Sequence, residues 1–476
     1  MSVLARSEFQ RGASALREAT NAGASSAADL SLCRQVARLF LERMQSGGVP
    51  EALRRKMRLH VADAVAIAWA AARGDALSGQ VLQALGMGGG SGACRVFGAP
   101  DRLAPPLAAL ANSALMHTLD FDDIHDLARL HPTSVCLPAA LAAAELVNAP
   151  LSRVLDAVIL ANELMCRLGT MYQPKGHGPG SDWFLTQLFG YFGAALAAAL
   201  VLGQAEDQIV SALGFAYMQA AGGKEAGFGV GATGRAIYPA FAAMGGVQAA
   251  LLARAGLVGP ESALDGAANL FSIYLGGPLE ASQRQTLLEP SGFHFEATQI
   301  KPWPCCRLSH PYVSAALALR ERWEGLPIRR IVVGVNASAD KLCRPLAGRR
   351  RPQTLQDAKY SIPYMTALAL ARGEVDLSGL GAAVLADQEV HALADRIEID
   401  ASLPDNPGHP PAVLRLETVS GQVLTAHAGN FDLGEDGVRR KFEACMAHAG
   451  RADTARDLWS RLMKTGAQVG LDDLFG

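Results

Sequence analysis

The feature that most constrains the fold is a set of segments that would be apolar on every face of a helix. The clearest is YFGAALAAALVL, residues 191–202, which contains no charged side chain. A helix of this kind is buried inside a bundle rather than laid on its surface, and its alanines favour helix formation. The segment is too short to span a bilayer. We therefore expect a buried helical bundle and no membrane association.

Helical periodicity dominates the first part of the chain, and strand-like segments appear after residue 287. The segments 329–338, 396–402 and 412–429 are rich in β-branched residues, and the last contains a Ser-Gly turn typical of a hairpin. The predicted helices are 31–45, 54–71, 103–119, 135–147, 153–168, 183–202, 205–220, 310–323, 358–371 and 388–394, and the tail 437–463 is predicted to return to helix.

This order of elements predicts a mainly α protein, with a large all-α helical domain and an inserted smaller α+β lid domain. The helical domain would comprise residues 1–286 and return in residues 431–476, and the lid would comprise residues 287–430. A cleft between two such bodies is a preferred place for a ligand site.

Charge and cysteine content exclude some classes of function. Charged residues make up 18% of the chain and the formal net charge is −2, so no field would gather nucleic acid. The 8 cysteines are scattered without a CxxC pair, which in a reducing compartment indicates buried thiols. The N-terminal MSVLARSEFQRG lacks the apolar core of a signal peptide. We expect a cytoplasmic protein.

The stretch LDFDDIHDLARLHPTSV crowds carboxylates and imidazoles into a chain that is otherwise poor in charge. Asp120, Asp122 and Asp123 would repel one another, so one of them would hold its proton near neutral pH. The alternatives are that the aspartates cap helix ends, or that Asp and His bind a metal. Because no HExxH or EF-hand spacing is present, we predict no metal site.

A glycine-rich stretch, residues 222–234, contains GVGATG, which formally matches the dinucleotide pattern GxGxxG. It follows no strand, and no acidic residue stands about 20 positions later, so we predict no nucleotide cofactor. The stretch carries Lys224 and is followed by Arg235. Its glycines would let backbone N–H groups approach an anion, which makes both cations candidates for substrate binding. The alternative is an ordinary surface loop.

The stretch IKPWPCCRLSHP places Lys301, Arg307 and His310 on a backbone stiffened by three prolines. A rigid segment that presents Lys and Arg suits a carboxylate-bearing ligand. It also lies where the helical part of the chain gives way to the mixed part. The alternative is a structured linker whose cations form salt bridges.

Together these segments resemble the MmgE/PrpD family. The resemblance rests on HTLDFDDIH followed by HPTSVCLPAALAAAE, then KPWPCCRLSHP and DAKYSIPYMTALALARGEV, with weaker matches in FGAALAAALVLG and GGVQAALLARAGLVGP. The matches follow the family's order over most of the chain. The resemblance implies a helical domain, an α+β lid, a homodimer, and chemistry without a cofactor or metal.

The family includes 2-methylcitrate dehydratase, cis-aconitate decarboxylase and iminodisuccinate epimerase, in which cations hold a small polycarboxylate while a bond or proton beside a carboxylate is moved. The resemblance places site residues on Asp120, His131 and Lys301. Fixed cations stabilise the negative charge that develops, and an imidazole with a pKa of about 6.5 can give or take a proton. We predict His131 as acid/base, Asp120 as its partner, and Lys301 with Arg307 as the carboxylate clamp; His310 is a weaker candidate.

Several positions depart from the family's pattern. Phe184 stands where many relatives have a histidine, although Thr186 remains, and Ile124 replaces the threonine of DFDDTH. Arg235 and Tyr238 stand where relatives often have the lysine and histidine of KRLHPG. Thr186, Arg235 and Tyr238 are therefore predicted to bind substrate, and Tyr238 would transfer a proton only with a strongly lowered pKa.

The predicted function is a cofactor-independent lyase, a dehydratase or decarboxylase, acting on a small di- or tricarboxylate. The alternative is an epimerase or isomerase, which needs the same proton abstraction without bond loss. A second alternative is a relative that binds a carboxylate without catalysis, which the changes at Phe184 and Ile124 keep open. His177, in the loop YQPKGHGPGSD, is a further candidate for carrying a proton.

Overall fold

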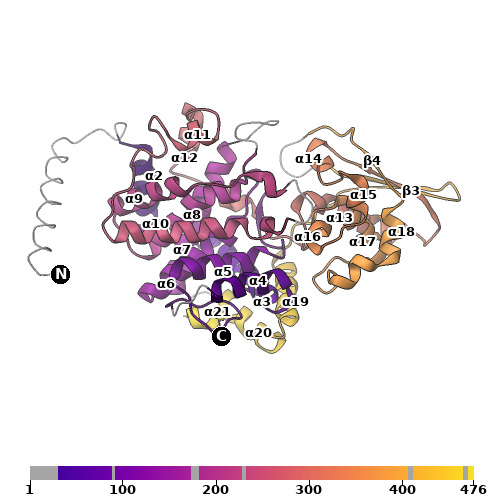
Figure 1. The fold of residues 1–476 in the computed structure, drawn as a ribbon, viewed down its shortest axis with the longest axis horizontal. Coiled ribbons are helices and arrows are strands. Elements are labelled where there is room, and N and C mark those ends of the chain that lie inside the picture. The colour runs from indigo at the N-terminus through magenta and orange to yellow at the C-terminus, as the bar shows by residue number, and fades with distance from the viewer. Residues whose placement is uncertain are drawn as a thin grey trace, which may run out of the picture.

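The computed structural model describes six stretches of the chain: residues 30–87, 92–172, 182–227, 232–405, 411–464 and 470–475. These residues form two bodies with separate hydrophobic cores, which lie side by side in Figure 1. The first core draws on residues 32–300 and again on residues 438–474, and the second draws on residues 305–426. The predicted mainly α class is confirmed, whereas a lid function and the boundaries at 286 and 430 stay predictions.

The first body is a helical bundle. Its helices are α2 (Leu32–Gln45), α3 (Glu51–Gly74), α4 (Ala76–Met87), α5 (Pro105–His117), α6 (Thr133–Val147), α7 (Leu151–Met171), α8 (Leu185–Val201), α9 (Glu206–Gln219), α10 (Tyr238–Arg254), α11 (Leu270–Tyr274), α12 (Ala281–Leu287), α19 (Glu435–His448), α20 (Ala452–Met463) and α21 (Leu471–Phe475).

Helix α8 forms the centre of the bundle, as its uniformly apolar sequence predicts. All of its side chains except Gln187 are buried, and it packs against α6, α7, α9 and α10. Small residues allow the closest approach: a Cβ built on Gly246 of α10 would lie 2.3 Å from the Cβ of Ala194. Within the described residues, no helix combines the length and the apolar character that crossing a membrane requires.

The second body combines a four-stranded sheet with helices (Figure 1). Its sheet has the order β4-β3-β5-β6, in which β3 pairs parallel with β4 and antiparallel with β5. Helix α13 packs against β5, β6 and α17. The elements are α13 (His310–Arg322), β3 (Ile328–Gly334), α14 (Ala337–Asp340), α15 (Leu346–Arg350), α16 (Leu355–Lys359), α17 (Ile362–Arg372), α18 (Gln388–Ala394), β4 (Ile397–Asp400), β5 (Val413–Thr418) and β6 (Val423–His427).

The predicted helix 358–371 is in fact two helices, α16 and α17. Pro363 lies in the first turn of α17, where its missing N–H costs nothing. Ser361 caps that turn, because its side chain accepts a hydrogen bond from the backbone N–H of Tyr364 at 3.1 Å. The break leaves Tyr360 between the two helices, and its position matters for the site described below.

A short two-stranded ladder joins the acidic loop to the segment that carries Lys301. Strand β1 (Ile124–His125) pairs antiparallel with β2 (Thr298–Gln299), with Ile124 opposite Gln299. In an antiparallel pair the residues before one strand run beside the residues after the other. The ladder therefore brings the loop that precedes Ile124 next to Lys301.

Candidate active site

Lys301 and Asp120 form a buried ion pair. The Nζ atom of Lys301 lies 2.5 Å from Oδ1 of Asp120, 3.0 Å from its backbone oxygen and 3.9 Å from Oδ1 of Asp122. The side chain of Lys301 is fully buried. Burial acts to lower the pKa of Lys301, but Asp120 and Asp122 outweigh it and raise that pKa above the ordinary value. The ammonium is therefore charged at neutral pH.

For Asp120 and Asp122 the predicted retention of a proton is wrong, because nearby cations and hydrogen-bond donors stabilise their charged forms. Burial acts to raise the pKa values of Asp120 and Asp122, yet Lys301, His117 and His131 outweigh burial and hold both below the ordinary value. Neither carboxyl group keeps a proton near neutral pH. Asp120 also adopts a left-handed backbone conformation, with φ of 52°, which costs a non-glycine residue about 1 kcal/mol and often marks functional sites.

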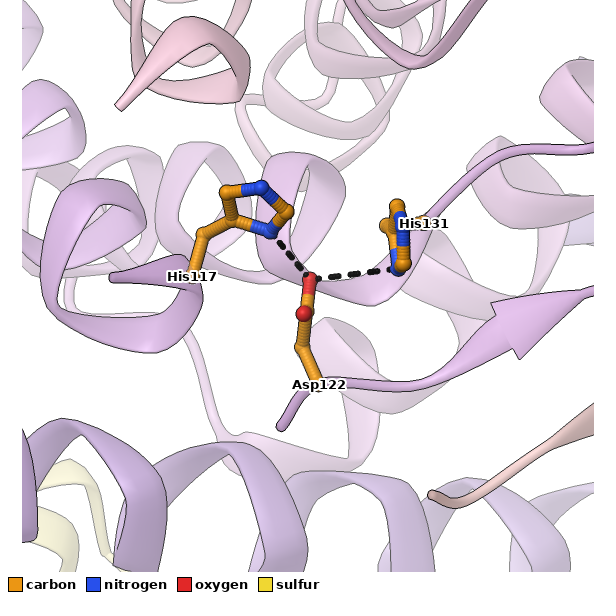
Figure 2. A group of neighbouring side chains, drawn as sticks. All are labelled: His117, Asp122 and His131. Carbon is orange, nitrogen blue, oxygen red and sulfur yellow. Dashed lines mark hydrogen bonds and ion pairs between the residues drawn. The ribbon is translucent and has the colours of Figure 1, made fainter. Parts of the chain in front are cut away.

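His117, Asp122 and His131 form a compact group beside this ion pair. Figure 2 shows both imidazoles directed at one oxygen of Asp122: the Nδ1 atoms of His117 and His131 lie 2.8 and 3.6 Å from Oδ2. His117 ends α5, and His131 lies two residues before α6 begins at Thr133. The two rings meet edge-on, with centroids 5.1 Å apart.

This group has the composition of a metal site, and its ligand atoms lie within 4.8 Å of one another. The Nδ1 atom of His131, however, lies 2.6 Å from the backbone oxygen of Asp123. A carbonyl oxygen only accepts hydrogen bonds, so Nδ1 of His131 carries the proton and has no lone pair for a metal. The ammonium of Lys301 close to Asp122 also opposes a second cation. A metal could therefore meet His131 only at Nε2, with Nδ1 donating to the carbonyl, and the expected absence of a metal stays a prediction.

His131 is set up as a neutral imidazole. Because Nδ1 carries the proton, Nε2 has the free lone pair. Burial lowers the pKa of His131 to about 4, against the opposing effect of Asp122 and with the help of Lys301. At neutral pH the free protein therefore presents an unprotonated imidazole here, rather than the partly protonated one that its ordinary pKa predicts.

Asp123 supports His131 from outside this group. Its side chain accepts hydrogen bonds from Nδ1 of His60 at 2.7 Å and from the hydroxyl of Thr133 at 2.5 Å, and Asn162 donates to that same hydroxyl at 2.9 Å. The sequence placed Asp123 in the acidic cluster without distinguishing its role. The structure separates it from Asp120 and Asp122, whose carboxylates contact Lys301 and His117 instead.

The predicted pairing of Asp120 with His131 is replaced by two other pairs. Asp120 contacts Lys301, while the carboxylate that lies 3.6 Å from His131 belongs to Asp122. Sequence spacing alone does not decide which aspartate faces which cation, because the left-handed turn at Asp120 and the β1–β2 ladder orient the loop.

Arg307 and His310 have partners away from this group. Arg307 forms a two-point ion pair with Asp126, at 2.8 and 2.6 Å, and its guanidinium lies 4.8 Å from the ring centroid of Phe431. His310 lies with Nε2 3.2 Å from the backbone oxygen of Cys305, and its ring packs against Trp303. Asp126 therefore holds Nε and Nη2 of Arg307, while Nη1 is buried without a hydrogen-bond partner among the described residues. The clamp of Lys301 with Arg307 stays a prediction.

Aromatic rings cover another side of the group. Tyr238 stacks on Phe184 with centroids 4.3 Å apart and meets His117 edge-on at 5.1 Å. Thr186 accepts hydrogen bonds from the backbone N–H of His131 at 3.1 Å and from the hydroxyl of Tyr238 at 3.3 Å. Burial raises the pKa of Tyr238, which is the opposite of what proton transfer by this phenol would need.

Arg235 joins the two bodies at this place. Its guanidinium lies 3.4 Å from the ring centroid of Tyr360, in the second body, and 6.0 Å from that of Phe184, in the first. Lys224 is half-buried, and burial, with the nearby cations Arg129 and Arg235, lowers its pKa to about 8. His177 and residues 228–231 of the glycine-rich stretch lie outside the described residues.

Three polar atoms of this group and of the neighbouring Asp120 are buried without a hydrogen-bond partner among the described residues: Oδ2 of Asp120, Oδ1 of Asp122 and Nε2 of His117. Buried polar atoms are nearly always satisfied in folded proteins. Three exceptions in one cluster indicate that water or a polar ligand completes the site. The arrangement offers a charged ammonium, a neutral imidazole and an unpaired imidazole nitrogen in one place.

Two buried lysines were missed by the sequence reasoning. Lys359 approaches the backbone oxygen of Thr118 at 3.4 Å, and Lys441 donates to the backbone oxygen of Phe121 at 2.7 Å. Both therefore contact the loop that carries Asp120. Lys359 lies in the DAKYS segment, but a lysine in a helical pattern gives no sign of burial until its neighbours are known.

Comparison with known proteins gives the same family at both ends of the chain. Residues 35–282 match the MmgE/PrpD N-terminal domain and residues 303–460 match the MmgE/PrpD C-terminal domain. The chain is 28% identical over 371 residues to a cis-aconitate decarboxylase of Aspergillus terreus (strain NIH 2624 / FGSC A1156), which covers 74% of each chain.

Two further relatives carry similar names. The cis-aconitate decarboxylase-like protein oryM of Aspergillus oryzae is 30% identical over 345 residues, covering 67% of this chain and 69% of the relative. The cis-aconitate decarboxylase of Homo sapiens is 28% identical over 329 residues, covering 65% and 64%. With both domains matched in order over most of its length, the chain belongs to the MmgE/PrpD family.

Proposed function

We propose that the protein is a lyase that acts on a small di- or tricarboxylate by acid/base chemistry beside a carboxylate, without a cofactor. Decarboxylation has the best support, because the matched relatives are named cis-aconitate decarboxylases. The observation that carries the proposal is the buried Lys301 ammonium close to Asp122, with the neutral imidazole of His131 on the other side of that carboxylate.

The reaction needs a proton as well as a cation. Loss of CO2 from an unsaturated tricarboxylate breaks one carbon–carbon bond, leaves the electron pair on the allylic carbon skeleton, and consumes one proton there. His131 is neutral in the free protein, but a polyanion bound beside it would raise its pKa, because nearby negative charge favours the imidazolium. Substrate binding would thus load His131 with the proton that the product requires.

Substrate anchoring falls to Lys301 and Arg235 in this proposal. Arg307 is held by Asp126, whereas the Arg235 guanidinium is stacked on Tyr360. A planar guanidinium recognises carboxylates through the N–H groups at its edges. Closure of the second body over the first would exclude water and strengthen these contacts.

An epimerase or isomerase is the second candidate, and the neutral state of His131 favours it. A neutral imidazole can accept a proton from the carbon next to a carboxylate and return it without any net proton uptake. Water loss by a dehydratase would begin with the same abstraction. The candidates therefore differ in products rather than in the residues they require.

One experiment separates these functions. The protein is incubated in deuterated water with cis-aconitate, 2-methylcitrate or iminodisuccinate, and products are followed by NMR and mass spectrometry. Loss of CO2 or water supports the lyase, and deuterium incorporation alone supports the epimerase. Tight binding with neither outcome would establish a carboxylate-binding protein and refute the proposed catalysis.

A further inference from the structure

Lys441 reaches the acidic loop from a distant part of the chain. It lies on α19, in the segment that returns to the first body, and α19 packs against α3. Its Nζ atom lies 2.7 Å from the backbone oxygen of Phe121 and 2.7 Å from Oδ1 of Asp63 on α3. Lys441 and Asp63 are 7% and 2% exposed. A buried ammonium thus contacts a backbone carbonyl of the site loop.

Phe121 is the residue between Asp120 and Asp122. Its ring packs against the ammonium of Lys441, with Nζ 3.7 Å from the ring centroid, while its two neighbours direct their carboxylates to Lys301. Successive side chains of the loop therefore go to two different lysines. Because the peptide carbonyl of Phe121 is held, the backbone from which both neighbouring side chains extend is restrained with it.

We propose that Lys441, held by Asp63, is a positioning residue for the chemistry at Lys301 and His131. It sets the backbone of the loop so that Asp120 meets Lys301 and Asp122 meets His117. The inference rests on the proposed function for its catalytic consequence, but its geometric consequence does not depend on any substrate. In this proposal the C-terminal helix α19 supports the active site in addition to packing against the helical bundle.

The test removes the pair of Lys441 and Asp63 without leaving one of the two charges buried alone. The double variant Lys441→Met/Asp63→Asn keeps both side chains close to their original size and removes both ionisable groups together. Burial raises the pKa of Asp63 to about 7 against the opposing effect of Lys441, so the readouts are taken above pH 7. Lys441→Arg keeps a cation and donors and serves as the conservative rescue. Arg439→Met is the matched control, because Arg439 lies on the same helix and forms an exposed ion pair with Glu443.

Two readouts are used. The first is the NMR titration of ¹³C-labelled His117 and His131 in the protein without substrate, assigned with His117→Gln and His131→Gln. We expect the double variant to move at least one of these two titration midpoints, since Asp122 would no longer be held beside both rings. The second is turnover: we expect kcat to fall at least tenfold with KM changed less than threefold, Lys441→Arg to recover most of kcat, and Arg439→Met to change neither readout.

The inference is overturned by a folded double variant whose histidine titrations and kcat match those of Arg439→Met. If the wild-type protein proves to have no lyase or epimerase activity, the proposed function fails while the histidine titrations still decide the positioning role. If the double variant does not fold, Asp63→Asn alone carries the same titration test, since it keeps Lys441 but removes the carboxylate that holds it.

Discussion

Lys301 and Asp120 are 181 positions apart in the sequence, yet their charged atoms lie 2.5 Å from each other in the interior. Their meeting follows from the register of β1 with β2, which runs Ile124 beside Gln299. Both side chains are almost fully removed from water. A charge buried in this way depends on its partner, because an uncompensated ion in the interior is costly.

Lys301→Met should therefore destabilise the protein by about 3–5 kcal/mol, since it leaves the Asp120 carboxylate buried without its partner. The double variant Lys301→Met/Asp120→Asn should recover most of that loss, because no charge is stranded. Neither variant should have measurable turnover, as both lack the ammonium. Urea unfolding gives the stabilities, and a double variant as unstable as the single one would show that the ion pair is not the source of the loss.

His131 should take up a proton when a polycarboxylate binds. In the free protein burial lowers its pKa to about 4, with Asp122 opposing and Lys301 and His117 assisting that effect, so the ring is neutral at pH 7. A bound polyanion adds negative charge nearby and raises that pKa. Calorimetry in buffers of different ionisation enthalpy should show uptake approaching one proton per site at pH 6, compared with little uptake for His131→Gln.

The exposed His427 on β6 provides the matched control: His427→Gln should take up as many protons as the wild-type protein. Binding of the same ligand without uptake in the wild type would contradict the role given to His131 as the proton donor. That result would mean that His131 stays neutral when the ligand binds. It would favour a mechanism in which His131 only abstracts a proton from the substrate.

The sequence predicted the architecture well because apolar periodicity is a local signal. The uniformly apolar segment became the central helix α8, and the predicted helix 388–394 coincides with α18. The error at residues 358–371 has a local cause, since Pro363 in a first turn marks a new helix. Within the site, the acidic loop and the Lys301 segment were correctly chosen as neighbours.

The contacts inside the site were less predictable, because they depend on long-range pairing. The family resemblance led to the prediction that Asp120 is the partner of His131, but the left-handed turn at Asp120 directs its carboxylate to Lys301. Arg307 is the type of residue expected to bind a carboxylate, and only the fold reveals that it forms an ion pair with Asp126. Lys441 is 320 positions from the carbonyl that it contacts, so no sequence window contains both.

Arg307→Lys should affect stability more than catalysis. A lysine keeps the charge but not the two-point contact with Asp126, and loss of such a pair in a partly buried place should cost about 1–3 kcal/mol. We expect KM to change less than threefold. Thermal unfolding and steady-state kinetics measure both, and a tenfold rise in KM at unchanged stability would return Arg307 to the substrate clamp.

Arg235→Lys should affect catalysis more than stability. The substitution loses the planar group that stacks on Tyr360 and offers paired donors to a carboxylate. We expect KM to rise at least tenfold, and loss of the cation–π contact by itself to cost about 1 kcal/mol or less of stability. Equal KM values for Arg235→Lys and the wild-type protein would mean that another cation binds the substrate.

Tyr238→Phe separates the two roles that the phenol can have. The ring stacks on Phe184 and meets His117 edge-on, and Phe keeps both contacts. The hydroxyl makes a 3.3 Å hydrogen bond to Thr186, and burial raises its pKa, so it stays protonated and is a poor proton carrier at neutral pH. We therefore expect kcat within about twofold of wild type and a stability loss of about 1 kcal/mol, the net value of one hydrogen bond.

Tyr238→Ala, which removes the ring, should cost about 3–5 kcal/mol. Kinetics and urea unfolding of both variants decide the matter: a hundredfold loss of kcat in a stable Tyr238→Phe protein would make the hydroxyl, and not the ring, the catalytic feature of this position.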